Sequence, residues 1–224
     1  ITTENLSSAE KNYVRQAIQQ AKENNPSLIY EINLIEKFLL LQFDLDTTQA
    51  EKELWIEFVM RFQQLTSPLM AKGLVDTLFY VYNRLLSLNE VGGNPDIFGI
   101  SLANFHSFNE QRFCYWPHTL NTTATHDTKR GEDIRARLNV RSEIPEEYEQ
   151  HIKERNSLNG TKKRLVKGTS APDKNDEYFL YQTLLGAFPF YAHEYSFFLS
   201  RLKEYLVKAV REANIHSSWL TPDI

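Results

Sequence analysis

Residues 124–137 read Ala-Thr-His-Asp-Thr-Lys-Arg-Gly-Glu-Asp-Ile-Arg-Ala-Arg. This stretch holds one histidine, three carboxylates and four cations, and almost no bulky apolar side chain. The small and β-branched residues 122–125 favour a short extended segment, and Asp127 or Thr128 can cap a helix whose first turn is acidic. The pair His126 and Asp127 would then lie where an extended segment passes into a helix, which is where α/β barrels present catalytic side chains.

The same stretch also has a purely structural interpretation. A charged helix is usually a solvated surface, and Glu132 and Asp133 can pair with Lys129, Arg135 or Arg137 at helical spacing. Such pairs contribute a few tenths of a kcal/mol each. From these residues alone, the structural interpretation outweighs catalysis.

Composition limits the classes of protein to consider. The chain has 224 residues, of which 42% are hydrophobic and 24% are charged, enough for one large domain or two small ones. Its formal net charge of −4 argues against a nucleic-acid or membrane-surface partner, and it contains no apolar run long enough to span a bilayer. The single Cys114 excludes an internal disulfide framework and a cysteine-based zinc site, and it fits the reducing cytoplasm. The six histidines show no metal-ligand spacing, so we expect neither metal nor cofactor.

Helical signals recur along the whole chain. Ser7 with Glu10 and Thr48 with Glu51 form capping-box patterns, and apolar residues follow them with a period near 3.6. Ser67-Pro68 is typical of a helix start and predicts a helix that runs to about Leu88. The further helices are expected near 101–113, 128–142, 145–159, 178–187 and 193–213, with a basic, flexible connection at 160–174. We therefore predict an all-α, predominantly helical chain with at most short strands, near Thr119 to Thr125.

A second polar pattern lies in residues 70–93. Lys72, Asp76 and Asn83 occur at positions i, i+4 and i+11, so they share one face of the expected helix, with Asn89 and Glu90 at its end. A polar stripe on an otherwise apolar helix needs a partner or a ligand. The alternative is an ordinary surface helix followed by the Gly92-Gly93 turn.

Both stretches resemble one enzyme family. Residues 125–138 are similar to the pattern T-H-D-T-K-R-x-E-D-x-R-A-R-L of the maltooligosyl trehalose synthases, which belong to the α-amylase superfamily. Residues 70–93 resemble the family's A-K-G-x-x-D-T-x-F-Y-x-Y-N-R-L-x-x-L-N-E-V-G-G pattern, with Val75 and Val81 where an acidic residue and an arginine are expected. Residues 172–187 and 208–219 match later stretches of the family, so the resemblance extends from about Trp55 onward.

The resemblance implies an intramolecular transglycosylation that turns the reducing-end α-1,4 link of a malto-oligosaccharide into an α,α-1,1 link. Such retaining chemistry uses a nucleophilic carboxylate and an acid/base carboxylate, and the superfamily adds a third carboxylate in an x-x-H-D motif. Asp127 matches that third carboxylate, which stabilises the transition state, and His126 matches the histidine beside it. The implied substrate-binding residues are Lys72, Asp76, Asn83, Asn89, Glu90, Lys129 and Arg130.

The nucleophile and the general acid are not identifiable in this chain. In the superfamily both precede the x-x-H-D motif, on strands with their own signatures, whereas the residues before Asp127 read as helical. The chain also lacks an initiator Met and a signal peptide. We therefore expect an internal fragment that is inactive alone and whose partners are the malto-oligosaccharide substrate and the rest of its polypeptide.

The expected fragment has two regions: a helical bundle at 1–116, and at 117–224 a helical-shell part of an incomplete (β/α)8 barrel. A non-catalytic helical interaction module is the alternative. Incubation with maltopentaose separates the two functions, because only the enzyme forms a non-reducing product.

Overall fold

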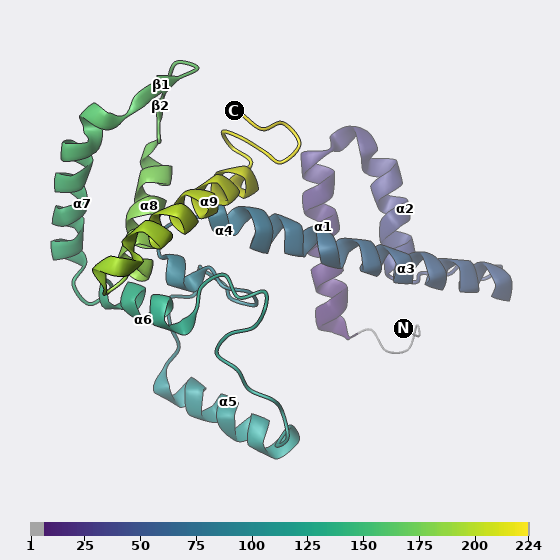
Figure 1. Ribbon diagram of the computed structural model, residues 1–224. Coiled ribbons are helices and arrows are strands. Elements are labelled where there is room, and N and C mark those ends of the chain that lie inside the picture. Colours follow the sequence, from purple (N-terminus) through teal and green to yellow (C-terminus); the bar gives the residue numbers. More distant parts are fainter. Residues whose placement is uncertain (1–6, 224) are drawn as a thin grey trace. The chain divides into compact units, whose positions relative to one another are not determined.

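The computed structural model describes residues 7–223, and the chain separates into two compact units, residues 1–70 and 71–224. Figure 1 shows a predominantly helical chain with one pair of short strands among the described residues, which confirms the predicted fold class. The boundary expected from sequence, at 116/117, lies inside the second unit, because elements from both sides of it share one core.

The described residues of the first unit form three α-helices, α1 (Ser8–Asn24), α2 (Ile29–Leu39) and α3 (Gln49–Met70). The start signals of α1 and α3 are those read from the sequence: the Ser7 and Glu10 side chains each bond the other residue's backbone amide, and Thr48 and Glu51 repeat the arrangement. Each box satisfies amides that the first helical turn leaves without partners. Apolar side chains then hold the helices together, with Phe38 edge-on to Trp55 at a ring separation of 4.5 Å.

The expected helix start at Ser67-Pro68 is wrong. Pro68 lies inside α3, which continues to Met70, and residues Ala71–Leu78 form a π-helical segment. A serine–proline start signal is a local preference of about 1 kcal/mol, and a longer helix can outweigh it.

The second unit contains six further helices and one β-hairpin among the described residues. Their bounds are α4 (Phe79–Val81), α5 (Leu102–Tyr115), α6 (Glu132–Val140), α7 (Pro145–Asn159), α8 (Lys174–Ala187), α9 (Tyr195–Ala213), β1 (Arg164–Val166) and β2 (Thr169–Ala171). A 3₁₀ turn at Leu86–Leu88 follows α4. Figure 1 shows α5 projecting away from α6, α8 and α9, which pack together.

The core of the second unit brings together segments that are distant in sequence. It is built from Tyr80, Leu86, Leu138, Phe179, Ala209 and Ala213. Helices α6 and α8 approach closely at Gly186, where an added Cβ would lie 2.6 Å from Cγ2 of Ile134. This core connects the two parts of the site described below, because Tyr80 lies within one sequence motif and Leu138 ends the other.

Residues 119–125 form no strand, which the prediction of at most short strands there allowed, and the described strands lie instead in the segment predicted to be a flexible connection. β1 and β2 pair antiparallel through a turn at Lys167 and Gly168, both with positive φ. A lysine–glycine pair suits such a tight hairpin because glycine adopts positive φ without steric cost. Residues 119–125 lack a neighbouring strand among the described residues, and an unpaired strand leaves its backbone groups without partners.

Across residues 7–223, no helix combines the length and apolar character that crossing a membrane requires.

Candidate functional site

The pair His126–Asp127 lies at the tip of a tight turn. Thr125 closes the turn, since its carbonyl accepts the Thr128 amide at 3.2 Å and its own amide donates to the Thr128 hydroxyl at 2.5 Å. The expected helix cap at Asp127 or Thr128 is wrong, because α6 begins at Glu132 and its N-cap is Gly131. The hydroxyl of Thr128 is used to close the turn and is not available as a helix cap.

The turn presents both side chains outward. The His126 and Asp127 side chains are 89% and 70% exposed, and His126 Nε2 lies 3.1 Å from Asp127 Oδ2. Among the described residues, neither Arg135 nor Arg137 forms an ion pair with Asp127. The arrangement that would have marked Asp127 as half of a structural ion pair is therefore not found, and the carboxylate is free to contact a ligand.

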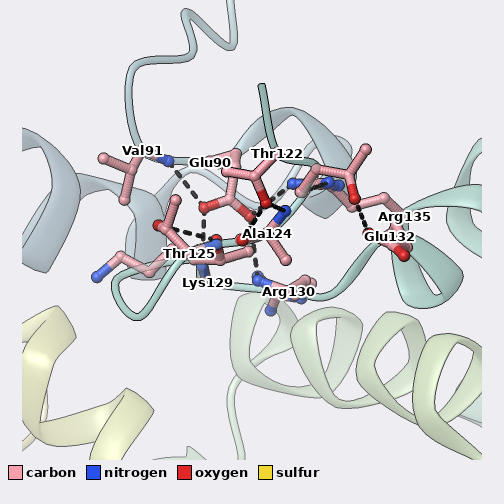
Figure 2. Close-up of polar contacts among 11 residues, drawn as sticks. Glu90, Val91, Thr122, Ala124, Thr125, Lys129, Arg130, Glu132 and Arg135 are labelled. Carbon is pink, nitrogen blue, oxygen red and sulfur yellow. Dashed lines mark hydrogen bonds and ion pairs between the residues drawn. The ribbon is translucent and has the colours of Figure 1, made fainter. Parts of the chain in front are cut away.

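Figure 2 shows the carboxylate of Glu90 bonded to the backbone that follows this turn. Its carboxylate oxygens accept two consecutive backbone amides, that of Lys129 at 2.7 Å and that of Arg130 at 3.1 Å. The two motifs found in the sequence therefore form one site, because one supplies the carboxylate and the other the turn.

A second link joins the motifs at Asp76. Its carboxylate accepts hydrogen bonds from Lys72 at 2.6 Å and from Lys129 at 2.9 Å, and the Lys129 amine also lies over the Tyr80 ring. The hydrogen bonds from Lys72 and then Lys129 lower the pKa of Asp76. The hydrogen bond to Asp76 raises the pKa of Lys72, and the charge of Asp127 adds to that shift. Two lysine amines therefore surround the Asp76 carboxylate at this site.

Asn83 and Asn89 occupy different positions from those expected. Asn83 does not share the helical face of Lys72 and Asp76, because α4 ends at Val81 and Asn83 is buried. Asn89 is only 1% exposed and donates to the backbone carbonyls of Phe79, at 3.0 Å, and of Tyr82, at 2.7 Å. Both side chains hold the chain segment after α4, which favours a supporting role over contact with sugar.

Arg130 also points inward. Its guanidinium lies over the rings of Phe179 and Tyr205 and donates to the Tyr205 hydroxyl at 3.0 Å. Burial raises the pKa of Tyr205, so this phenol stays neutral and can accept the bond. Arg130 therefore connects the segment after the turn to α8 and α9.

Sequence reasoning missed the roles of Arg135 and Tyr205. Arg135 donates to the Glu90 carboxylate at 3.3 Å and to the Thr123 carbonyl, so it spans both sides of the loop. Contacts of this kind cannot be predicted from the neighbouring sequence, because Arg135 is one of several charged residues in the same helix. The regular spacing pointed instead to pairing within α6.

One group of side chains has the chemistry of metal ligands. Asp173, Asp176 and His216 place one ligating atom each within 4.8 Å of the others. Hydrogen bonding accounts for this arrangement without an ion, because Asp173 caps α8 and also pairs with His216 Nε2 at 2.8 Å.

Comparison with known proteins gives one consistent result. No family model matches the chain. A protein of Mycobacterium tuberculosis that is provisionally named a maltooligosyl trehalose synthase is 39% identical over 167 residues, which is 75% of this chain and 20% of that protein. The solved maltooligosyltrehalose synthase of Arthrobacter ramosus is 31% identical with a TM-score of 0.72, covering 95% of this chain and 24% of its own. A Sulfolobus tokodaii structure described as a hypothetical maltooligosyl trehalose synthase is 30% identical with a TM-score of 0.64, covering 95% and 32%.

These relatives are several times longer than the chain, which spans about a fifth of the curated relative and a quarter to a third of the solved ones. The matches nevertheless cover most of the chain and all bear the same family name. The chain therefore belongs to the maltooligosyl trehalose synthase family and corresponds to about a fifth to a third of the length of these relatives.

Proposed function

We propose that this chain is part of a cytoplasmic enzyme that converts the reducing-end α-1,4 link of malto-oligosaccharides into an α,α-1,1 link. The observation that carries the proposal is the exposed Asp127, presented on a turn that Glu90 anchors and beside the Lys72–Asp76–Lys129 cluster. The same residues carry the family motifs. In this proposal the nucleophile and the general acid belong to parts of the enzyme outside this chain.

Asp127 has the chemistry to stabilise the transition state. Glycosyl transfer passes through an oxocarbenium-like state in which hydrogen bonds to the ring hydroxyls strengthen. An ionised carboxylate accepts two such bonds, and the imidazole of His126, 3.1 Å away, can donate or accept another. Both side chains are exposed, so a sugar can approach them without a change in the turn.

Lys72 is the second residue that we assign to substrate contact. Its side chain is 76% exposed, and its amine pairs with Asp76 at 2.6 Å, while Asp76 also pairs with Lys129 from the motif that holds Asp127. Lys129 is mostly buried between Asp76 and Tyr80. We therefore propose that Asp76 and Lys129 mainly hold Lys72 and the turn in place, and that any direct contact of these two residues with sugar is secondary.

The test is Asp127→Asn in an enzyme that contains this segment together with the two further carboxylates. The substitution keeps the size of the side chain and removes the charge and one acceptor, so we expect the fold to be retained. Loss of one transition-state contact costs on the order of 3 kcal/mol, or about a hundredfold in kcat. His126→Ala should cost less, and Asp96→Asn, at an exposed carboxylate in the loop before α5, should cost nothing. A normal kcat for Asp127→Asn would refute the assignment.

The 224-residue chain alone should convert no maltopentaose, because it would supply only one of the three carboxylates. The measurement is the appearance of a non-reducing product after prolonged incubation. Turnover by the pure chain would show that the nucleophile and the general acid lie within it.

One observation favours the alternative of a non-catalytic helical interaction module. Helix α5 and the residue after it expose large apolar side chains, namely Leu102, Phe105, Phe108, Phe113, Tyr115 and Trp116. Such a surface is typical of a contact with other protein. An enzyme that contains this segment and remains inactive toward all malto-oligosaccharides would favour this second function.

A further inference from the structure

The carboxylate of Glu90 contacts the turn through backbone groups. Oε1 accepts the Lys129 amide at 2.7 Å, and Oε2 accepts the Arg130 amide at 3.1 Å. Hydrogen bonds to an ionised acceptor are stronger than neutral ones, and two parallel bonds also fix orientation. Glu90 therefore fixes the path of the backbone immediately after the His126–Asp127 tip.

The remaining acceptor positions of Glu90 are also used. Oε1 accepts the Val91 amide at 2.9 Å, and Oε2 accepts a hydrogen bond from Arg135 at 3.3 Å (Figure 2). The side chain is only 17% exposed. A carboxylate that already accepts four hydrogen bonds, two on each oxygen, has little capacity left for a sugar hydroxyl. This geometry argues against the substrate contact expected for Glu90 from the family motif.

The opposite end of the turn is fixed separately. Thr125 and Thr128 close it through two hydrogen bonds, and the only residues between them are His126 and Asp127. The tip is thus a two-residue projection that the Thr125–Thr128 hydrogen bonds close and that Glu90 holds at Lys129 and Arg130. A shift of the backbone at Lys129 and Arg130 moves the Asp127 carboxylate with it.

We propose that Glu90 is a positioning residue that sets the location of Asp127 by holding the backbone amides of Lys129 and Arg130. This inference rests on the proposed function, since the value of a fixed Asp127 lies in the transition state it meets. Glu90→Gln retains one acceptor but turns an NH₂ group toward backbone N–H groups and Arg135. The base of the turn is then released on one side. A displacement of about 1 Å in a catalytic group costs on the order of a hundredfold in rate.

The first arm of the test measures the turn itself in the 224-residue chain. Amide hydrogen exchange at Lys129 or Arg130, whichever amide loses its acceptor oxygen, should become at least about tenfold faster in Glu90→Gln, as expected for the loss of about 1.4 kcal/mol of protection. Exchange at Leu86, whose amide bonds to Gln182, should not change. Glu51→Gln is the matched control, because Glu51 also accepts a backbone amide but lies in the first unit. Unchanged exchange at Lys129 and Arg130 would overturn the proposal.

The second arm measures catalysis in an enzyme that contains this segment. A positioning role predicts that Glu90→Gln lowers kcat about tenfold to a hundredfold while KM changes less than about twofold. A rise in KM at constant kcat would instead restore Glu90 as a substrate ligand and overturn the proposal. Faster exchange at Leu86 in Glu90→Gln would mean that the substitution disturbs more than the turn. Both arms are then repeated with Glu90→Asp, which keeps the negative charge on a side chain shorter by one methylene group.

The two arms separate the inference from the function on which it rests. An enzyme with native Glu90 that forms no α,α-1,1-linked product refutes the proposed function, and the exchange arm alone then decides whether Glu90 holds the turn. An active enzyme in which Glu90→Gln leaves kcat unchanged refutes the positioning role and leaves the function intact.

Discussion

Gln182, in the middle of α8, accepts the backbone amide of Leu86 at 2.9 Å through Oε1 and donates to the Asn83 carbonyl at 2.6 Å through Nε2. The side chain is fully buried. The side-chain amide of Gln182 therefore provides the hydrogen-bond partners that backbone groups would provide if this segment were part of a strand or a helix. It holds the irregular chain between α4 and the site where Glu90 lies.

Gln182→Leu should destabilise the second unit by about 3 kcal/mol. The substitution keeps the volume but leaves a buried N–H and a buried C=O without partners, each at a cost of about 1–3 kcal/mol. Chemical denaturation followed by circular dichroism measures the change. Gln150→Leu, on the exposed and charged α7, is the matched control and should change stability by less than about 0.5 kcal/mol. Equal stability of the two variants would contradict the account.

Gly186→Ala tests the close approach of α6 and α8. The new methyl would lie 2.6 Å from Ile134 Cγ2 and 3.4 Å from Leu138 Cγ, so either the Ile134 side chain or the helices must shift. Overpacking of this kind costs about 1–3 kcal/mol, partly offset by the better helix propensity of alanine. Thermal unfolding should show a lower Tm. Gly73→Ala, whose added Cβ would meet nothing within 4 Å, should not lower it.

Local signals in the sequence predicted local structure well. The two capping boxes, at Ser7 and Thr48, form as expected because every group they need lies within four residues. The amphipathic spacing likewise predicted most of the helices. The helix start predicted at Ser67-Pro68 was wrong, because this local signal is weaker than the interactions that continue α3 through it.

The site could be predicted as a set of residues but not as an arrangement. The motifs pointed to Lys72, Asp76, Glu90 and the turn at Asp127, and the structure joins these through contacts that span 39 to 53 residues of sequence. No periodicity or composition encodes which carboxylate meets which amide. The burial of Asn89 could not be predicted for the same reason, because it depends on the hydrogen bond that its side chain donates to the backbone carbonyl of Phe79.

The ion pair of His216 with Asp173 gives a pH dependence of known sign. The hydrogen bond to Asp173 raises the pKa of His216, opposed by burial and assisted by the charge of Asp176. Because the folded pKa is raised, the pair stabilises the chain fully below the ordinary histidine value and loses this effect as the pH rises through the folded pKa. The attachment of residues 215–223 to α8 should therefore weaken above neutral pH.

Titration of the His216 imidazole by NMR measures this effect directly. Its midpoint should lie above the ordinary pKa of a histidine side chain and should fall in Asp173→Asn. Asparagine preserves the cap of α8, so helix loss does not confuse the result. Asp176→Asn should lower the midpoint by a smaller amount, because Asp176 Oδ2 is 3.8 Å from Nε2 whereas Asp173 Oδ2 is 2.8 Å from it. A midpoint unaffected by Asp173→Asn would show that the pair does not form in solution.

The pairing of Asp76 with Lys129 should contribute a measurable coupling energy to folding. Lys129 is 13% exposed and also lies over the Tyr80 ring, so its charge is screened less than that of a surface lysine. A double-mutant cycle with Asp76→Asn and Lys129→Met should give a coupling of about 1 kcal/mol at pH 7, at the upper end of the range for partly exposed pairs. The cycle with Lys72→Met should give less, because Lys72 is 76% exposed.

Acid and salt distinguish the two lysines further. The pKa of Asp76 is lowered by its hydrogen bonds, so its stabilising effect is present above the ordinary aspartate pKa and is lost as the pH falls through the lowered pKa of the folded state. Both couplings should therefore decrease as the pH falls through that folded pKa. Salt at about 1 M should remove the coupling of Lys72 and leave most of that of Lys129, because solvent ions reach only the exposed pair. A coupling of Lys129 no larger than that of Lys72, or one that salt abolishes, would mean that Asp76 does not join the two motifs in the way the structure shows.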